Sequence, residues 1–293
     1  MSFIEQIKQR AKQEIKTIVL PEATDVRILE AAEMIKNEGY AKVILIGNEE
    51  EVRKLAKERN IDIGETKIID PAVSIETARY SKELYELRKS KGMTEEQAEK
   101  LVLEPVYFGM MMVKLNEADG LVSGAAHSTS DTLRPALQIL KTAPGTKLVS
   151  AFFVMVVPNC KYGENGTFIF ADSGLNEEPD SEKLSEIAIS SSKSFEQLVG
   201  TQPKVAMLSY STYGSAHSAS TEKVIEATKL VKEKEPNLLV DGELQLDAAI
   251  IPEVAEFKAK GSPLKGQANV LVFPDLGAGN IGYKLVQRLA KAE

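Results

Sequence analysis

The chain has 293 residues, of which 43% are hydrophobic and 27% charged, a composition typical of a globular protein with enough apolar residues for two cores. The formal net charge of −7 argues against a broad nucleic-acid-binding surface, although a local cluster of arginines can still hold an anion. The single cysteine, Cys160, excludes a disulfide within the chain and fits a reducing compartment such as the cytoplasm.

Two further classes of protein are disfavoured. The start of the chain, Met1–Lys16, is a charged helical pattern rather than a signal peptide, and no apolar run has the length of a membrane-spanning helix. We therefore expect no membrane partner. The sequence has only two histidines, His127 and His217, which argues against a histidine-based zinc site.

Short apolar runs alternate with amphipathic stretches along the sequence. The runs Thr17–Pro21 and Lys42–Gly47 are each followed by a helical pattern, at Asp25–Glu38 and Glu49–Arg59. This alternation is typical of βα units, so it predicts an α/β fold with a largely parallel sheet. Further strands are predicted at Thr66–Asp70, Gly120–Gly124, Leu148–Val157, Thr167–Ala171, Val205–Ser209, Leu238–Asp241 and Asn269–Pro274.

A long helical block lies between the third and fourth of these strands. It comprises Ser74–Lys89, Thr94–Leu103 and Val106–Asn116, and Thr94 with Gln97 predicts a capping box at the start of the second helix.

A hairpin is predicted where the polar turn Cys160–Gly166 separates two apolar runs. The run before it, Leu148–Pro158, is rich in β-branched and aromatic residues and predicts a buried strand. Because a hairpin in a parallel context suggests a change of topology, we place a domain boundary near Pro144 and Gly145. The predicted domains are residues 1–145 and 146–293.

The segment Ser128–Arg134 follows a strand and the small-residue loop Gly124–Ala126, and it opens a helix. Exposed amides at a helix N-terminus, several hydroxyl groups and the planar fork of Arg134 together would suit a phosphate. We place Pro135 in the first turn of that helix, where proline is tolerated. The alternative is ordinary N-capping by Ser128 or Thr129 beside a surface arginine, and the sequence alone leaves both open.

A second glycine-rich turn, Asp275–Lys284, also joins a strand to a helix. Gly277, Gly279 and Gly282 have the spacing of a dinucleotide fingerprint, but no acidic residue follows at the required distance. Asn280 and Lys284 are four positions apart and share one helix face, which could point to the strand ends. An ordinary βα turn is the alternative.

Three other features are weaker candidates. Asp241 and Asp247 follow a strand and could pair around a metal, although a solvated loop is favoured. Arg88 lies near the end of a predicted helix, together with other cations. Cations at this position usually stabilise the helix C-terminus. Cys160 has no histidine beside it in sequence, so a nucleophilic role is disfavoured.

Several of these stretches together resemble one family, the phosphate acetyltransferases. The similarity runs from end to end, and the block Ala118–Pro135 is its most specific element; phosphate butyryltransferases are a less close match. The other stretches that carry the resemblance are Pro21–Arg27, Leu87–Lys89, Lys91–Thr94, Phe170–Asp172, Asp241–Gln245 and Phe273–Lys284.

The resemblance implies the reaction acetyl-CoA + phosphate ⇌ acetyl phosphate + CoA, without metal or other cofactor. It implies two three-layer α/β/α domains with a cleft between them, as in isocitrate and isopropylmalate dehydrogenases, and a cytoplasmic homodimer. Arg88 and Arg134 match arginines that bind substrate. Ser128 and Thr129 match hydroxyl groups that contact phosphate, and Cys160 matches a cysteine that is not the nucleophile.

Asn280 and Lys284 are added to these site residues as candidates for orienting acetyl phosphate. Members of the family continue for a few dozen residues beyond Glu293, and the resemblance places their general base in that segment. The base is therefore unassigned here.

Two alternatives to this enzyme stay open. A phosphate butyryltransferase would differ in its acyl group, and a binding module for acetyl-CoA or acetyl phosphate would lack catalysis. A nicotinamide-dependent dehydrogenase follows from fold kinship alone and is disfavoured.

Overall fold

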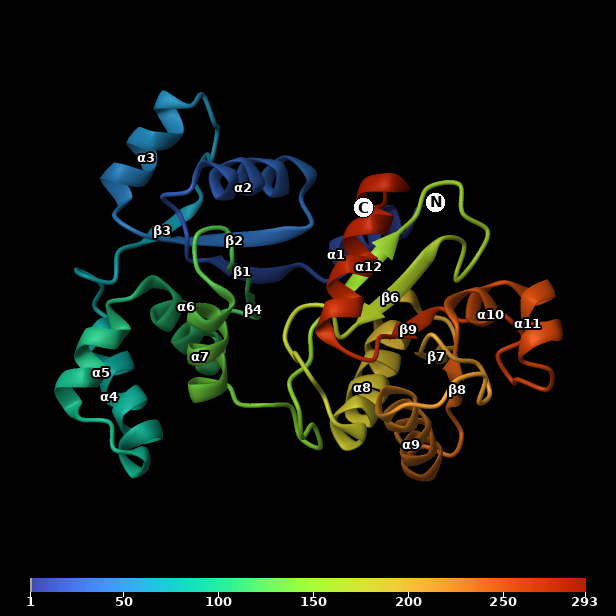
Figure 1. Ribbon diagram of the computed structural model, residues 1–293. Coiled ribbons are helices and arrows are strands. Elements are labelled where there is room, and N and C mark those ends of the chain that lie inside the picture. The colour runs from blue at the N-terminus through green and yellow to red at the C-terminus, as the bar shows by residue number, and fades with distance from the viewer. Residues whose placement is uncertain (1) are drawn as a thin grey trace. The chain divides into compact units, whose positions relative to one another are not determined.

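The computed structural model describes residues 2–293, and the chain divides into two compact units, Met1–Lys141 and Thr142–Glu293. Each unit contains one sheet with helices on both faces (Figure 1). The α/β class predicted from the alternating pattern is therefore confirmed. Each strand predicted from the sequence is present, although the strands at positions 67, 120, 152 and 270 are shorter than expected.

The first unit is built on a fully parallel sheet with the strand order β3-β2-β1-β4. Its elements in chain order are α1 (Phe3–Gln13), β1 (Lys16–Leu20), α2 (Val26–Glu38), β2 (Ala41–Ile46), α3 (Glu49–Glu58), β3 (Lys67–Ile69), α4 (Thr77–Arg88), the 3-10 helix η1 (Lys89–Lys91), α5 (Glu95–Val102), α6 (Pro105–Lys114), β4 (Gly120–Leu121) and α7 (Thr129–Ile139).

Alternate residues of β1 and β2 supply the two cores of this unit. Val19 and Ile44 point to the face covered by α4–α7, where Phe108 is fully buried. Leu20 and Leu45 point to the opposite face, which α2 and α3 cover. The period of two in the strands thus separates the helices into two layers.

The close contact between α6 and the sheet depends on Gly109. A Cβ atom at this position would lie 2.6 Å from Leu121 Cδ1 and 2.9 Å from Val19 Cγ1. Because only glycine permits this approach, α6 can lie directly on β1 and β4. The preceding residues of α6, including Tyr107, are thereby fixed near the carboxyl ends of these strands.

The second unit has a mixed sheet with the strand order β5-β6-β9-β7-β8, in which β5 alone is antiparallel to its neighbour among the described strands. Its elements are β5 (Phe152–Val156), β6 (Thr167–Ala171), α8 (Ser181–Val199), β7 (Lys204–Leu208), α9 (Ala219–Lys234), β8 (Leu239–Leu244), α10 (Leu246–Ile250), α11 (Pro252–Lys258), β9 (Val270–Val272) and α12 (Leu276–Leu289).

The hairpin predicted around Cys160–Gly166 is confirmed, because β5 and β6 pair antiparallel on either side of it. The prediction of a buried strand at Leu148–Pro158 is wrong. Within the described sheet β5 pairs only with β6, so it is an edge strand, and Phe153 remains 38% exposed. Apolar composition predicted the strand correctly but could not place it at the edge.

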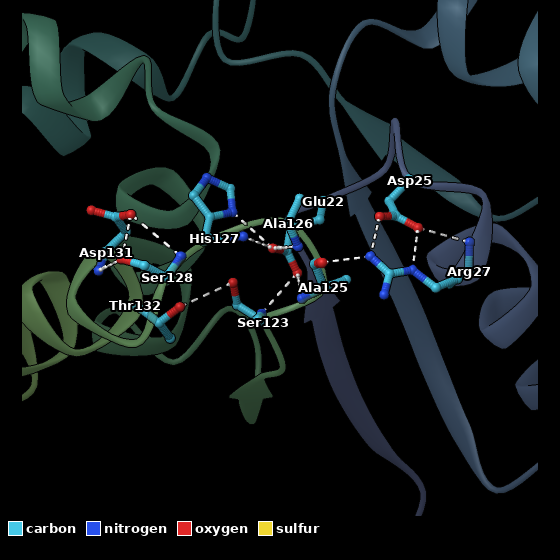
Figure 2. Close-up of polar contacts among 11 residues, drawn as sticks. Glu22, Asp25, Arg27, Ser123, Ala125, Ala126, His127, Ser128, Asp131 and Thr132 are labelled. Carbon is cyan, nitrogen blue, oxygen red and sulfur yellow. Dashed lines mark hydrogen bonds and ion pairs between the residues drawn. The ribbon is translucent and has the colours of Figure 1, made fainter. Parts of the chain in front are cut away.

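A buried carboxylate holds the loop between β4 and α7. Glu22 follows β1, and its side chain is only 1% exposed. One oxygen, Oε2, accepts hydrogen bonds from the amides of Gly124 and Ala125 at 2.9 Å each (Figure 2). The other, Oε1, accepts from the amides of Ala126 at 2.7 Å and His127 at 2.8 Å, and lies 2.8 Å from His127 Nδ1.

Burial by itself raises the pKa of Glu22, because it disfavours the charged form. The hydrogen bonds from the amides of Ala126 and Ala125, and from His127, outweigh that effect and hold the pKa at about 2. The carboxylate is therefore ionised at neutral pH and acts as an internal anion for four consecutive amides.

We predict that Glu22→Gln lowers the free energy of unfolding of the first unit by about 2–3 kcal/mol at pH 7. The substituted side chain loses the charge and directs an NH2 group at amides that are themselves donors. Urea denaturation measures the change. Glu30→Gln is the matched control, because Glu30 is an exposed residue of α2. Equal midpoints for the two variants would contradict the prediction.

The same interaction predicts a dependence of stability on pH. The pKa of Glu22 is depressed to about 2 in the folded chain, against about 4.3 for an unfolded glutamate. Its stabilisation is thus complete above the unfolded value and is lost as the pH falls to about 2. The gap in unfolding free energy between the parent chain and Glu22→Gln should narrow as the pH falls through this window. A gap that is constant with pH would refute the assignment.

Candidate active site

The first turn of α7 begins with a capping box that the sequence did not predict in this form. Ser128 is the N-cap, its Oγ accepts from the Asp131 amide at 3.3 Å, and it donates to Asp131 Oδ2 at 2.6 Å (Figure 2). Asp131 Oδ2 accepts hydrogen bonds from the Ser128 hydroxyl and from the Ser128 amide, and these two bonds lower the pKa of Asp131. The capping interpretation of Ser128 is therefore confirmed, with Asp131 as its partner.

The capping box also corrects the position of Pro135. The helix starts at Thr129, so Pro135 lies inside it and is buried rather than in its first turn. The reciprocal hydrogen bonds of Ser128 and Asp131 fix the start of the helix more strongly than the positional preference of proline.

The loop before α7 does not supply free amides for an external anion. The amides from Gly124 to His127 donate to Glu22. The Ser128 amide donates to Asp131 Oδ2 at 3.3 Å. Within residues 2–293, the two amides that follow, those of Thr129 and Ser130, have no hydrogen-bond acceptor, and both residues are exposed. The donors available to a ligand therefore start at Thr129, one turn later than the small-residue loop suggested.

Arg88 and Arg134 come from different helices of this unit and approach the same tyrosine. Tyr107 in α6 is 8% exposed, and its hydroxyl group donates a hydrogen bond to Gln138 Oε1 at 2.9 Å. Burial raises the pKa of Tyr107, while the charges of Arg134 and Arg88 lower it. Arg134 and Tyr107 line one cavity, and the charge of Arg88 also acts on this hydroxyl group.

Neither of these arginines has a carboxylate partner in the described part of the chain. Arg134 is exposed and forms no ion pair there, and Arg88 Nε is buried without a hydrogen-bond partner. Water can hydrate the exposed Arg134, but a buried unsatisfied donor such as Arg88 Nε is costly unless a partner binds it. The expectation that Arg88 serves only the end of α4 does not account for that buried donor.

A cavity of about 180 Å³ lies beside this cluster. Such a volume suits a group of phosphate size rather than a whole cofactor. One arginine, Arg134, and two carboxylates, Glu104 and Asp131, line it, so its field is not uniformly positive. The lining residues are Glu104, Val106, Tyr107, His127, Asp131, Arg134 and Pro135.

In the second unit, Asn280 and Lys284 share α12 as predicted. Lys284 is exposed, with its Nζ 5.7 Å from the centre of the Tyr283 ring, and Asn280 is half-buried. The start of α12 lies against the loop after β6, because a Cβ atom on Gly279 would be 2.5 Å from the Asp172 carbonyl oxygen. Both candidate side chains are therefore held on an anchored helix of this unit.

The remaining candidates have other partners. Asp241 accepts from the Tyr213 hydroxyl at 2.5 Å and pairs with Lys232, whereas Asp247 pairs with Lys258. These two carboxylates therefore do not share one site. In residues 2–293, no cluster of histidine, cysteine and carboxylate side chains has the composition of a metal site, and no helix has the length and apolar character needed to cross a membrane.

Sequence reasoning missed three residues of this region: Glu22, Tyr107 and His127. The available signal for Glu22 was a carboxylate placed directly after a buried strand, with a small-residue loop elsewhere that needed an acceptor. Tyr107 had no such signal, because an aromatic residue in an apolar helix usually belongs to the core.

Comparison with known proteins gives a consistent result. The family model described as "Phosphate acetyl/butaryl transferase" matches residues 2–293. A phosphate acetyltransferase of Acetivibrio thermocellus is 66% identical over 100% of this chain and 88% of its own length. One from Bacillus subtilis is 51% identical over 94% of this chain and 83% of its own.

Solved structures agree with these sequences. The EutD phosphotransacetylase from Staphylococcus aureus has a TM-score of 0.89 and 46% identity, covering 99% of this chain and 87% of that one. A phosphotransacetylase from Streptococcus pyogenes has a TM-score of 0.90 and 41% identity, with the same coverage. The chain therefore belongs to the phosphate acetyl/butaryl transferase family.

Proposed function

We propose that this chain transfers an acetyl group between coenzyme A and phosphate, in the reaction acetyl-CoA + phosphate ⇌ acetyl phosphate + CoA. The observation that carries the proposal is the pair Arg88 and Arg134, which lack carboxylate partners in the described chain: Arg134 lines the cavity of about 180 Å³, and Arg88 Nε is buried without a hydrogen-bond partner. Such a pair suits a tetrahedral anion, since guanidinium groups bind phosphate oxygens in a bidentate manner.

The chemistry is a direct transfer. Towards acetyl-CoA, the CoA thiolate attacks the acetyl carbonyl carbon, the bond to the phosphate oxygen breaks, and phosphate leaves with the electron pair. Cationic donors stabilise the charge that grows on the leaving phosphate. Because no atom changes oxidation state, no redox cofactor is required, and CoA serves only as a substrate. We propose that cationic side chains stabilise the phosphate charge without a metal.

Each candidate residue has a proposed role in this reaction. Arg88 and Arg134 hold phosphate oxygens, and Thr129 offers a free hydroxyl and amide at the start of α7. Ser128 can donate to phosphate only after its hydroxyl leaves Asp131, to which it donates at 2.6 Å. Asn280 and Lys284 are proposed to orient acetyl phosphate.

Acetyl rather than butyryl transfer is favoured by the relatives. Those at 66%, 54% and 52% identity are all phosphate acetyltransferases. A branched-chain phosphotransacylase from Enterococcus faecalis is only 20% identical. We further propose a cytoplasmic homodimer, on the basis of the family resemblance and of Cys160 as the single, unpaired cysteine.

We predict that Arg134→Ala lowers kcat/KM for phosphate roughly 10²–10³-fold, the loss expected when one charge-stabilising donor is removed. The KM for CoA should change little. Formation and cleavage of the thioester bond, followed by absorbance in both directions, gives these constants. Arg134→Lys should recover only part of the loss, because lysine keeps the charge but cannot form the bidentate hydrogen bonds of a guanidinium group.

Arg59→Ala is the matched control for this experiment. Arg59 is an exposed arginine of the same unit, at the end of α3, and does not line the cavity. Equal kinetics for the two alanine variants, or a loss at Arg134 confined to the KM for CoA, would exclude the phosphate-binding role.

A further inference from the structure

His127 presents one ring nitrogen to Glu22 and leaves the other available. Its Nδ1 lies 2.8 Å from Glu22 Oε1, and its backbone amide donates to the same oxygen (Figure 2). The side chain is 32% exposed, and Nε2 has no hydrogen-bond partner among residues 2–293. The imidazole therefore contacts the buried carboxylate through Nδ1 and leaves Nε2 available to a ligand.

The carboxylate fixes the tautomer of this imidazole. Glu22 is ionised at neutral pH, since its pKa is held at about 2, and an ionised carboxylate can only accept hydrogen bonds. Nδ1 must therefore carry a proton in the neutral ring. The lone pair of the neutral imidazole then lies on Nε2, the arrangement that lets a histidine accept and return a proton.

The surroundings of the ring place it at the phosphate-sized cavity. His127 lines that cavity together with Tyr107 and Arg134. The charged and titratable groups that face it are Glu22 from the end of β1, Glu104 and Tyr107 from the start of α6, and Asp131 and Arg134 from α7.

We propose that His127, oriented by Glu22, contacts bound phosphate through Nε2 and carries the phosphate proton during acetyl transfer. This inference rests on the proposed function and deepens it, because it assigns a proton-transfer residue at the phosphate side of the reaction. It does not assign the group that removes the proton from the CoA thiol.

The proposed step balances in both directions. Towards acetyl phosphate, an unprotonated oxygen of hydrogen phosphate forms a bond to the acetyl carbon, and the bond between carbon and sulfur breaks, leaving its electron pair on the CoA thiolate. The remaining P–OH proton passes to Nε2 of His127. In the reverse direction the thiolate attacks, the bond between carbon and oxygen breaks, and Nε2 returns the proton to phosphate.

Nuclear magnetic resonance of the imidazole nitrogens tests the contact without requiring activity. The chain has two histidines, so a ¹⁵N-histidine-labelled sample gives two sets of ring signals, and His217→Asn assigns them. Titration with inorganic phosphate should shift the Nε2 signal of His127 in a saturable manner. His217, an exposed residue of the other unit, is the internal reference. Absence of a shift specific to His127 would overturn the inference.

His127→Asn tests the proton transfer. The asparagine NH2 can replace Nδ1 as the donor to Glu22, so the loop is retained while Nε2 is removed. We expect kcat to fall roughly 10²–10⁴-fold, the usual contribution of a positioned acid or base, with the urea midpoint unchanged. His217→Asn should keep the parent kcat.

The outcomes separate this inference from the proposed function. Parent kcat in His127→Asn would overturn the proton-transfer role while leaving the transferase intact. Absence of any acetyl transfer by the parent chain would count against the proposed function, and the phosphate titration would still decide whether His127 contacts phosphate. A lowered kcat together with a lowered urea midpoint would overturn the inference in favour of a structural role.

Discussion

Glu22 imposes the constraint on which the geometry of the first unit depends. A carboxylate with 1% of its side chain exposed must be hydrogen-bonded, because its desolvation would otherwise be prohibitive. Four consecutive amides and one imidazole nitrogen satisfy it. The loop therefore has a fixed path, which sets where α7 begins and so where Thr129 and Arg134 lie.

The second unit uses the same type of anchor. Asp172, which directly follows β6, is 2% exposed and accepts from the amides of Ala151, Gly174 and Leu175 and from the Asn176 side chain. Glu243 in β8 is 3% exposed and accepts from the Ser211 hydroxyl and the Gly214 amide. In both units, buried carboxylates near the carboxyl ends of strands replace the missing partners of loop amides.

Local patterns predicted the strands and most helices, because periodicity and caps are local properties. Thr94 and Gln97 form the capping box expected from their spacing. The hydrogen bonds of Glu22 join residues 102 to 105 positions apart, and no local pattern contains that information. The effect of the Arg88 and Arg134 charges on Tyr107 likewise depends on tertiary structure. Family resemblance singled out both arginines, but only the fold brings them to one hydroxyl group.

The five hydrogen bonds of Glu22 also explain how a carboxylate can lie beside the proposed phosphate site. An unpaired anion there would repel the ligand, but its charge is spread over five hydrogen bonds with nitrogen partners. The same hydrogen bonds orient the imidazole of His127, so one buried group shapes the loop and directs Nε2. Within residues 2–293, the Nε of Arg88 is buried and unsatisfied, and the proposed binding of an anion by Arg88 and Arg134 would remove that cost.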